Sequence, residues 1–250
     1  MGAGGLGRPA AVGLARALLT IIQFIHNPPP LSSQHVDTGE ILMQAFADRA
    51  SVAETLQTGL ATFYSRSRAE RWCKGETSGA YLRVLSAHAD CDGDSLILLC
   101  DPIGPACHTG APSCWFSSVS VAEPGGGVST AAGPAGAALP TLLSLERTVA
   151  GRVAAPPPEA GSKPSWTARL LADQPLLLSK VREEADELAR AVEDGEGPGR
   201  VAAEAADLAY HAVVALRAAG VPVADVLAVL RSRFGVSGVL EKAARPPKEE

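Results

Sequence analysis

Alternating apolar and polar positions mark the first half of the chain. Four segments alternate as expected for half-buried strands, with Gly, Thr, Asp and Ser at the turns between them: GEILMQAF (39–46), ATFYSRS (61–67), AYLRVLSAH (80–88) and DSLILLC (94–100). One helix is predicted over 48–58, because DRASVAETLQTG opens with the capping residue Asp48 and closes on Gly59. We therefore expect this half to be mainly β.

Beyond residue 138 the apolar period changes to 3.6. Apolar stripes with Pro or Gly at the breaks predict five helices: LPTLLSLERTVAGRV (139–153), SWTARLLAD (165–173), PLLLSKVREEADELARAVED (175–194), GRVAAEAADLAYHAVVALRAAG (199–220) and PVADVLAVLRSRFG (222–235). Residues 154–164 predict an exposed connection between two of them. This half is expected to be a helical bundle.

The two patterns are separated by residues 122–138, which have no periodicity and many Gly, Ala and Pro, as a linker does. The predicted fold class is α+β multidomain: a mainly-β domain over 36–121, then an all-α domain over 139–245. Residues 1–35 are interpreted as a transit or disordered segment. The first 36 residues contain arginine and no Asp or Glu, as organelle transit sequences do, and a wrongly delimited start is the alternative.

Composition excludes some partners. The chain has 22 Lys and Arg against 27 Asp and Glu, a net charge of −5, which argues against a nucleic-acid surface. No run approaches the roughly twenty apolar residues that span a bilayer. Three of the five cysteines stand next to Asp or His, and the five are not at staple-like intervals, which favours a reducing compartment and metal thiolates over disulfides.

Four of the five cysteines and four aspartates gather in ADCDGDSLILLCDPIGPACHTGAPSCWF (89–116). Cys91, Cys107 and Cys114 could reach one centre if a loop folds back on the strand that carries Cys91, and three thiolates leave a zinc ion one open position for chemistry. The alternate residues of DCDGD share a face whose hard oxygens suit magnesium, namely Asp90, Asp92 and Asp94. Cys73 and Cys100 are interpreted as small buried side chains.

The motifs FYSRSRAERWCKGETSG, DCDGD, GPACHTG and SCWF, in that order, resemble phosphoribosyl-AMP cyclohydrolase. The resemblance implies a zinc enzyme of histidine biosynthesis that adds water at C6 of the adenine ring of phosphoribosyl-AMP. It also implies that zinc is held by Cys91, Cys107 and Cys114 and magnesium by Asp90, Asp92 and Asp94, in sites formed across a homodimer with cysteines from both subunits.

Nearby polar residues have predicted roles in that reaction. His108 stands next to Cys107 and is the natural proton shuttle, with a hydrogen-bonding role as the alternative. The stretch 65–79 supplies local positive charge in an acidic chain, and its predicted phosphate-binding residues are Arg66, Arg68, Lys74, Thr77 and Ser78. Solubilising surface charge is the competing interpretation, especially for Arg71.

Carboxylates also cluster on two of the predicted helices. In KVREEADELARA, Glu187 lies four positions after Glu183 and three after Glu184, so one helix face presents a carboxylate cluster. In AAEAADLAYHAVVAL, the residues Glu204, Asp207 and His211 share a face of an otherwise apolar helix. Acidic groups facing a bundle core need a compensating cation such as magnesium, although a solvated acidic stripe would explain the first helix.

The motifs SWTARLL, KVREEADELARA, EAADLAYH and RSRFGVSGVLEKAAR resemble phosphoribosyl-ATP pyrophosphohydrolase, an all-α nucleotide pyrophosphohydrolase related to the MazG type. The resemblance implies magnesium-dependent release of pyrophosphate. The implied metal ligands are Glu183, Glu184, Glu187, Glu204 and Asp207, of which Glu187 and Asp207 are the catalytic candidates. Lys180 and Arg233 are expected to steady the phosphates.

Together the two resemblances imply a bifunctional enzyme of histidine biosynthesis, plastid-located as in plants or else cytoplasmic, that binds small nucleotides as a homodimer. The alternative is a zinc-stabilised nucleotide-binding module with a non-catalytic helical dimerisation bundle. At its start the chain departs from the cyclohydrolase pattern, in which a PAIVQD-type strand leads directly into TGEVLM. We expect TIIQ (20–23) to be that strand, with 24–35 as an inserted loop.

Overall fold

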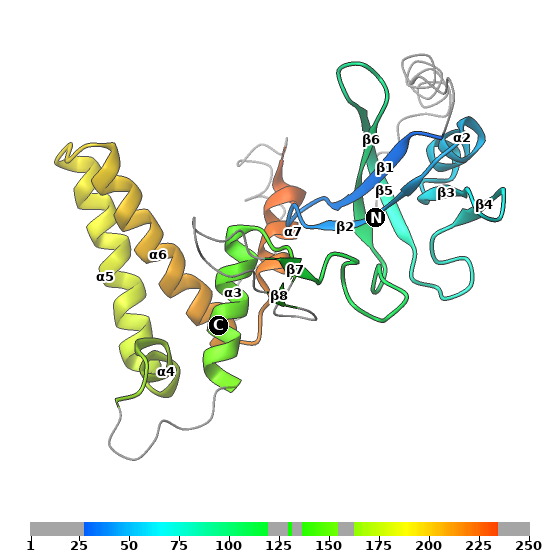
Figure 1. Cartoon of the computed structure of the whole chain (residues 1–250). Helices are drawn as coiled ribbons and strands as arrows, with labels where there is room; N and C mark the ends of the chain where they lie inside the picture. Colours follow the sequence, from blue (N-terminus) through cyan, green and yellow to red (C-terminus); the bar gives the residue numbers. More distant parts are fainter. Residues whose placement is uncertain (1–27, 120–129, 132–136, 155–162, 235–250) are drawn as a thin grey trace, which may run out of the picture. The chain divides into compact units, whose positions relative to one another are not determined.

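The computed structural model describes residues 28–119, 130–131, 137–154 and 163–234 (Figure 1). The chain divides into two compact units, with the boundary in the sequence between Ala138 and Leu139. The first unit is rich in strands and the second is helical, so the predicted α+β layout is confirmed. The predicted transit segment, where it covers 1–27, and most of the predicted linker lie outside the described residues.

The first unit is built on one mixed sheet of six strands in the order β4-β3-β2-β1-β6-β5. β1 and β6 pair in parallel at its centre, and every other pairing is antiparallel. The strands are β1 (Pro30–His35), β2 (Ile41–Phe46), β3 (Thr62–Ser65), β4 (Glu70–Cys73), β5 (Leu82–Ala89) and β6 (Leu96–Pro102). Inward positions along these strands supply the core, which includes Leu31, Leu42, Phe63, Leu82 and Leu98.

The helix α2 (Arg49–Thr58) lies where the sequence predicts it. Asp48 accepts a hydrogen bond of 2.8 Å from the backbone N–H of Ser51, and Gly59 ends the helix with φ 71°. Thr55 ties the helix to β3, because its hydroxyl oxygen accepts a hydrogen bond of 2.9 Å from the N–H of Thr62.

Strand β1 corrects the prediction for the start of the fold. Residues 30–35 were expected in an inserted loop and outside the β domain, yet they form a central strand paired with both β2 and β6. Leu31 and Ser33 are both fully buried at alternate positions. Because a serine fills the second inward position and two prolines precede the strand, its apolar alternation cannot be seen in the sequence.

Two more pairings were not predicted. Strand β4 forms a hairpin with β3, in which Phe63 stacks on Trp72 with ring centroids 5.0 Å apart. The strands β7 (Ser118–Val119) and β8 (Thr130–Ala131) form a two-stranded ribbon, and β8 lies within the predicted linker. Strands of two residues are too short to show a period in the sequence.

The second unit contains all five predicted helices, with boundaries that differ by no more than a few residues. They are α3 (Thr141–Ala154), α4 (Trp166–Ala172), α5 (Gln174–Glu193), α6 (Pro198–Ala218) and α7 (Val223–Arg233). The long helices α5 and α6 lie side by side (Figure 1). Their core includes Val149, Leu170, Leu177, Val214 and Val223. None of the described helices is by itself long and apolar enough to cross a membrane.

Candidate metal centres

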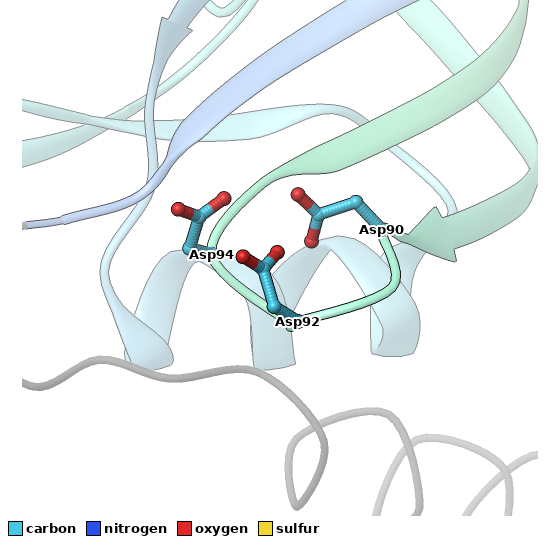
Figure 2. Close-up of side chains that lie close together, drawn as sticks. All are labelled: Asp90, Asp92 and Asp94. Atoms are coloured by element: carbon cyan, nitrogen blue, oxygen red, sulfur yellow. The ribbon is translucent and has the colours of Figure 1, made fainter.

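The turn between β5 and β6 brings three aspartates together. Figure 2 shows Asp90, Asp92 and Asp94 around this turn, with carboxylate oxygens within 4.8 Å of one another. Gly93 allows the turn because it adopts φ 75°. All three aspartates are exposed, and the backbone N–H of Ser95 donates a 3.1 Å hydrogen bond to Asp90.

The three carboxyl groups affect each other's protonation. The pKa of Asp94 is raised by its hydrogen bond with Asp90 and by the negative charges of Asp92 and Asp90. Desolvation opposes ionisation of Asp90, but hydrogen bonds from Ser95, Asp94 and Asp92 lower its pKa overall. Hard oxygens that repel one another at this spacing are a donor set that fits a divalent cation such as magnesium.

Two of the three candidate zinc ligands, Cys107 and Cys114, lie beside each other in the loop after β6. The Oγ1 of Thr109 donates a hydrogen bond of 3.1 Å to the Cys107 sulfur, and this bond lowers the pKa of that thiol. Desolvation and the neighbouring Cys107 raise the pKa of Cys114 to about 11. Cys114 is held in place by a hydrogen bond of 2.8 Å from its N–H to the carbonyl of Leu42 on β2. Two adjacent thiols, one of them with a lowered pKa, fit a soft ion such as zinc.

Lys74, a predicted phosphate-binding residue, directs its ammonium group to two backbone carbonyls. Its side chain is buried, and Nζ donates to the carbonyl oxygens of Ala80 at 2.8 Å and Pro105 at 3.5 Å. Burial lowers its pKa, while the charges of Cys114 and Cys107 oppose that shift. Lys74 therefore joins the loop 74–80 to the loop that carries the two thiols.

Cys91 does not form a group with Cys107 and Cys114 within one chain, so the condition that the loop folds back on the strand carrying Cys91 is not met. Cys91 precedes β6 and Cys107 follows it. The seven extended residues of this strand place its two ends roughly 20 Å apart. Among the described residues, the groups of three or more potential ligands contain no cysteine. Cys100 is fully buried as predicted, whereas Cys73 is only half-buried.

The other predicted residues of this unit are exposed. His108 is exposed, with Nδ1 3.8 Å from the Cys107 sulfur. The Arg66 guanidinium lies 3.5 Å from the centroid of the Phe46 ring, and Arg68 forms a 2.9 Å ion pair with Glu70. Thr77 and Ser78 are exposed in the turn after β4.

In the helical unit, Glu184, Glu204 and Asp207 lie within 4.8 Å of one another. Glu184 and Glu204 are buried, with 6% and 1% of their surfaces exposed. Desolvation raises the pKa of Glu204, Arg200 opposes this shift, and Glu187 and Asp207 add to it. Buried carboxylates that face one another across two helices fit a divalent cation.

Two expectations for these helices need correction. Asp207 was expected to face the core but is exposed at the edge of the group, because a step of three residues on α6 turns it away from the direction of Glu204. The solvated-stripe interpretation is wrong for Glu184, which is buried, and it fits the exposed Glu183.

Basic side chains already neutralise these acids. Lys180 forms ion pairs of 2.8 Å with Glu183 and 3.4 Å with Glu184, and Glu183 is the main cause of its raised pKa. Arg200, which the sequence analysis did not select, pairs with Glu204 one turn later. That pair could have been found from its i, i+4 spacing. Arg233 lies at the end of α7.

Comparison with known proteins assigns both units. The family model for phosphoribosyl-AMP cyclohydrolase matches residues 43–116, and the model for phosphoribosyl-ATP pyrophosphohydrolase matches residues 143–234. The chain is 46% identical over 217 residues to the chloroplastic histidine biosynthesis bifunctional protein hisIE of Arabidopsis thaliana, covering 85% of this chain and 74% of that protein. The chain belongs to the bifunctional HisIE family.

Bacterial HisIE proteins match as well. The protein of Deinococcus radiodurans is 41% identical over 222 residues, covering 88% of this chain and 92% of its own length. The protein of Pasteurella multocida is 36% identical over 214 residues, covering 84% and 96%. As a HisIE protein, the chain is a hydrolase of histidine biosynthesis with a cyclohydrolase and a pyrophosphohydrolase domain.

Proposed function

We propose that the helical unit first removes pyrophosphate from phosphoribosyl-ATP with magnesium, and that the β-rich unit then opens the adenine ring of phosphoribosyl-AMP with zinc. The observation that supports the proposal is that each matched domain contains side chains suited to hold a cation. Cys107 and Cys114 adjoin in the first, and Glu184, Glu204 and Asp207 converge in the second.

The zinc site is completed by a second copy of the chain in a homodimer. One chain supplies Cys107 and Cys114, and Cys91 comes from the other, because the length of β6 keeps Cys91 away from the other two thiols of its own chain. Bound zinc supplies a Lewis acid that makes water nucleophilic near neutral pH. The chain's own residues prepare this site: Thr109 stabilises the Cys107 thiolate, Lys74 holds the loop, and His108 moves a proton beside it.

Asp90, Asp92 and Asp94 form the magnesium site of the same unit, and exposed Arg66, Arg68, Thr77 and Ser78 supply contacts for a substrate phosphate. In the helical unit, bound magnesium supplies electrostatic stabilisation of the phosphate charge. Lys180 lies beside these carboxylates and would stabilise the negative charge of the phosphates. Glu187 contacts Glu204 and would orient the attacking water. Arg233 completes the proposed phosphate contacts.

A subunit-mixing experiment tests the zinc site. We expect Cys91→Ser and Cys107→Ser each to abolish zinc binding and ring opening, while Cys73→Ser, the control, keeps both. Mixing the two inactive variants and refolding them together should restore about a quarter of wild-type activity, because half of the dimers then carry one intact site. No recovery on mixing, or an active Cys107→Ser variant, would refute the proposed site.

A matched pair of glutamates tests the magnesium site of the helical unit. Glu204→Gln should abolish the release of pyrophosphate from phosphoribosyl-ATP, and Glu193→Gln, at the exposed end of α5, should leave it unchanged. The alternative of a binding module with a dimerisation bundle requires that neither the wild type nor these variants release pyrophosphate.

We also propose plastid localisation. It is supported by the chloroplastic relative from Arabidopsis thaliana and by the absence of Asp and Glu from residues 1–36. Because β1 belongs to the sheet, any removable segment has to end before Pro30. A fluorescent fusion of residues 1–29 should enter plastids, whereas a cytosolic fusion would refute this part of the proposal.

A further inference from the structure

His211 on α6 is a buried residue beside the acidic group of the helical unit, and it has no role in the activities described above. It is 5% exposed and contacts groups from three helices. Its partners are Trp166 on α4, Glu184 on α5 and the backbone carbonyl of Asp207 on its own helix.

These partners determine which ring nitrogen carries the proton. The indole Nε1–H of Trp166 can only donate, so His211 Nε2, 3.5 Å away, has to accept. The carbonyl oxygen of Asp207 can only accept, so His211 Nδ1, at 2.9 Å, has to donate. The ring is therefore the neutral Nδ1–H tautomer, and its N–H edge faces Glu184.

The edge of the ring faces one oxygen of Glu184 in particular. His211 Nδ1 lies 3.6 Å from Oε1 of Glu184, and the same Oε1 lies 3.4 Å from Nζ of Lys180. Both donors, the His211 Nδ1–H and the Lys180 ammonium, therefore lie on the side of Oε1. This arrangement would leave the other oxygen, Oε2, for a cation shared with Glu204 and Asp207.

We propose that His211 is a positioning residue that sets the orientation of the Glu184 carboxylate for divalent-cation binding, with its own tautomer set by Trp166 and the Asp207 carbonyl. This inference rests on the proposed metal site of the helical unit. Groups that hydrogen-bond or orient metal ligands typically change metal affinity or activity by about 10 to 100-fold when they are removed.

Helices α4 and α6, which the contact between Trp166 and His211 joins, offer a control residue without a hydrogen bond to the acidic group. Next to His211, the Tyr210 hydroxyl forms a hydrogen bond of 2.8 Å with Thr167, which also joins α6 to α4. Tyr210→Phe therefore removes a link between the same helices and leaves Glu184 untouched. A role for His211 in helix packing alone would make the two substitutions equivalent.

The test measures Mn²⁺ binding by the electron paramagnetic resonance signal of free Mn²⁺. The full-length chain carries D90N, D92N and D94N, so that the helical unit is the site measured. We expect H211F to weaken Mn²⁺ binding by about tenfold or more. H211N places an amide N–H where Nδ1 stands and should restore most of the affinity. H211Q places its amide where Nε2 stands and should not, and Y210F should bind Mn²⁺ like the parent.

The outcomes separate the positioning role of His211 from the proposed metal site of the helical unit. Wild-type affinity in H211F, an equal loss in Y210F, or equal rescue by Gln and Asn would overturn the role of His211. If H211F does not fold, which its melting curve will reveal, the comparison of H211N with H211Q decides. If E204Q also leaves Mn²⁺ binding unchanged, the metal site itself is wrong, and the failure is then not specific to His211.

Discussion

Thr109 donates a hydrogen bond of 3.1 Å from its hydroxyl to the sulfur of Cys107, two residues earlier in the chain. This bond favours the thiolate, and with backbone hydrogen bonds from Thr109 and His108 it lowers the pKa of Cys107. The loop therefore favours the thiolate, which is the form of cysteine that binds metals.

Thr109→Val should raise the pKa of Cys107 and slow its alkylation. A hydrogen bond contributes about 1 kcal/mol, so we expect a rate about two- to fivefold lower at pH 7 in zinc-free protein. The measurement is the rate of iodoacetamide labelling of the Cys107 peptide by mass spectrometry. Thr109→Ser keeps the hydroxyl and should label like the wild type, and equal rates in all three proteins would contradict the prediction.

Gly75→Ala should damage the β-rich unit far more than Gly79→Ala. Both glycines have positive φ, 93° and 75°, but a Cβ at Gly75 would lie 2.5 Å from the backbone nitrogen of Tyr81, whereas nothing lies within 4 Å at Gly79. We expect a loss of roughly 1 kcal/mol for Gly79→Ala and roughly 3 kcal/mol or more for Gly75→Ala. Urea unfolding and ring-opening activity measure the effect, and similar losses in the two variants would disprove it.

Leu170→Ala should destabilise the helical unit and spare ring opening. Leu170 is fully buried among the helical core residues, and the core of the β-rich unit is built from different residues. A buried leucine replaced by alanine costs about 2 to 5 kcal/mol. Calorimetry with separate assays of the two activities tests this, with the more exposed Leu178→Ala as control. Parallel loss of both activities would argue against independent cores.

The stability of the Glu40→Gln variant should increase relative to that of the wild type as the pH rises. Burial raises the pKa of Glu40, so the folded protein prefers the protonated carboxyl. The stability that this preference contributes is present below the ordinary pKa of about 4.5 and is lost as the pH rises through the folded-state pKa. The Tm of the wild type should therefore fall relative to that of Glu40→Gln between pH 4 and pH 7. A difference in Tm that stays constant with pH would rule out this role of burial.

Much of the fold could be predicted because its signals are local. Helix α2 has both its capping aspartate and its terminal glycine in the sequence, and the five helices of the second unit have apolar stripes bounded by Pro or Gly. Strand β1 could not be predicted, because Ser33 fills an inward position and its pairing with β6 joins residues far apart in the chain.

The candidate sites divide in the same way. Asp90, Asp92 and Asp94 could be grouped from the sequence because they lie on one short turn, and Glu184 and Glu204 could be selected as residues of two acidic helices. Their contacts could not be predicted: Lys74 turned out to hold two backbone carbonyls, and Trp166 reaches His211 from another helix.

The sequence by itself determined the α+β layout, the order of the two units and the chemical character of each group of candidate cation ligands, because periodicity, caps and ligand types are properties of neighbouring residues. Only the tertiary structure decided which of these side chains meet. It separated Cys91 from Cys107 by the length of β6, buried Glu204 beside Glu184, and placed His211 between Trp166 and Glu184. Such distances depend on strand pairing and helix packing, which join residues that are remote in the chain.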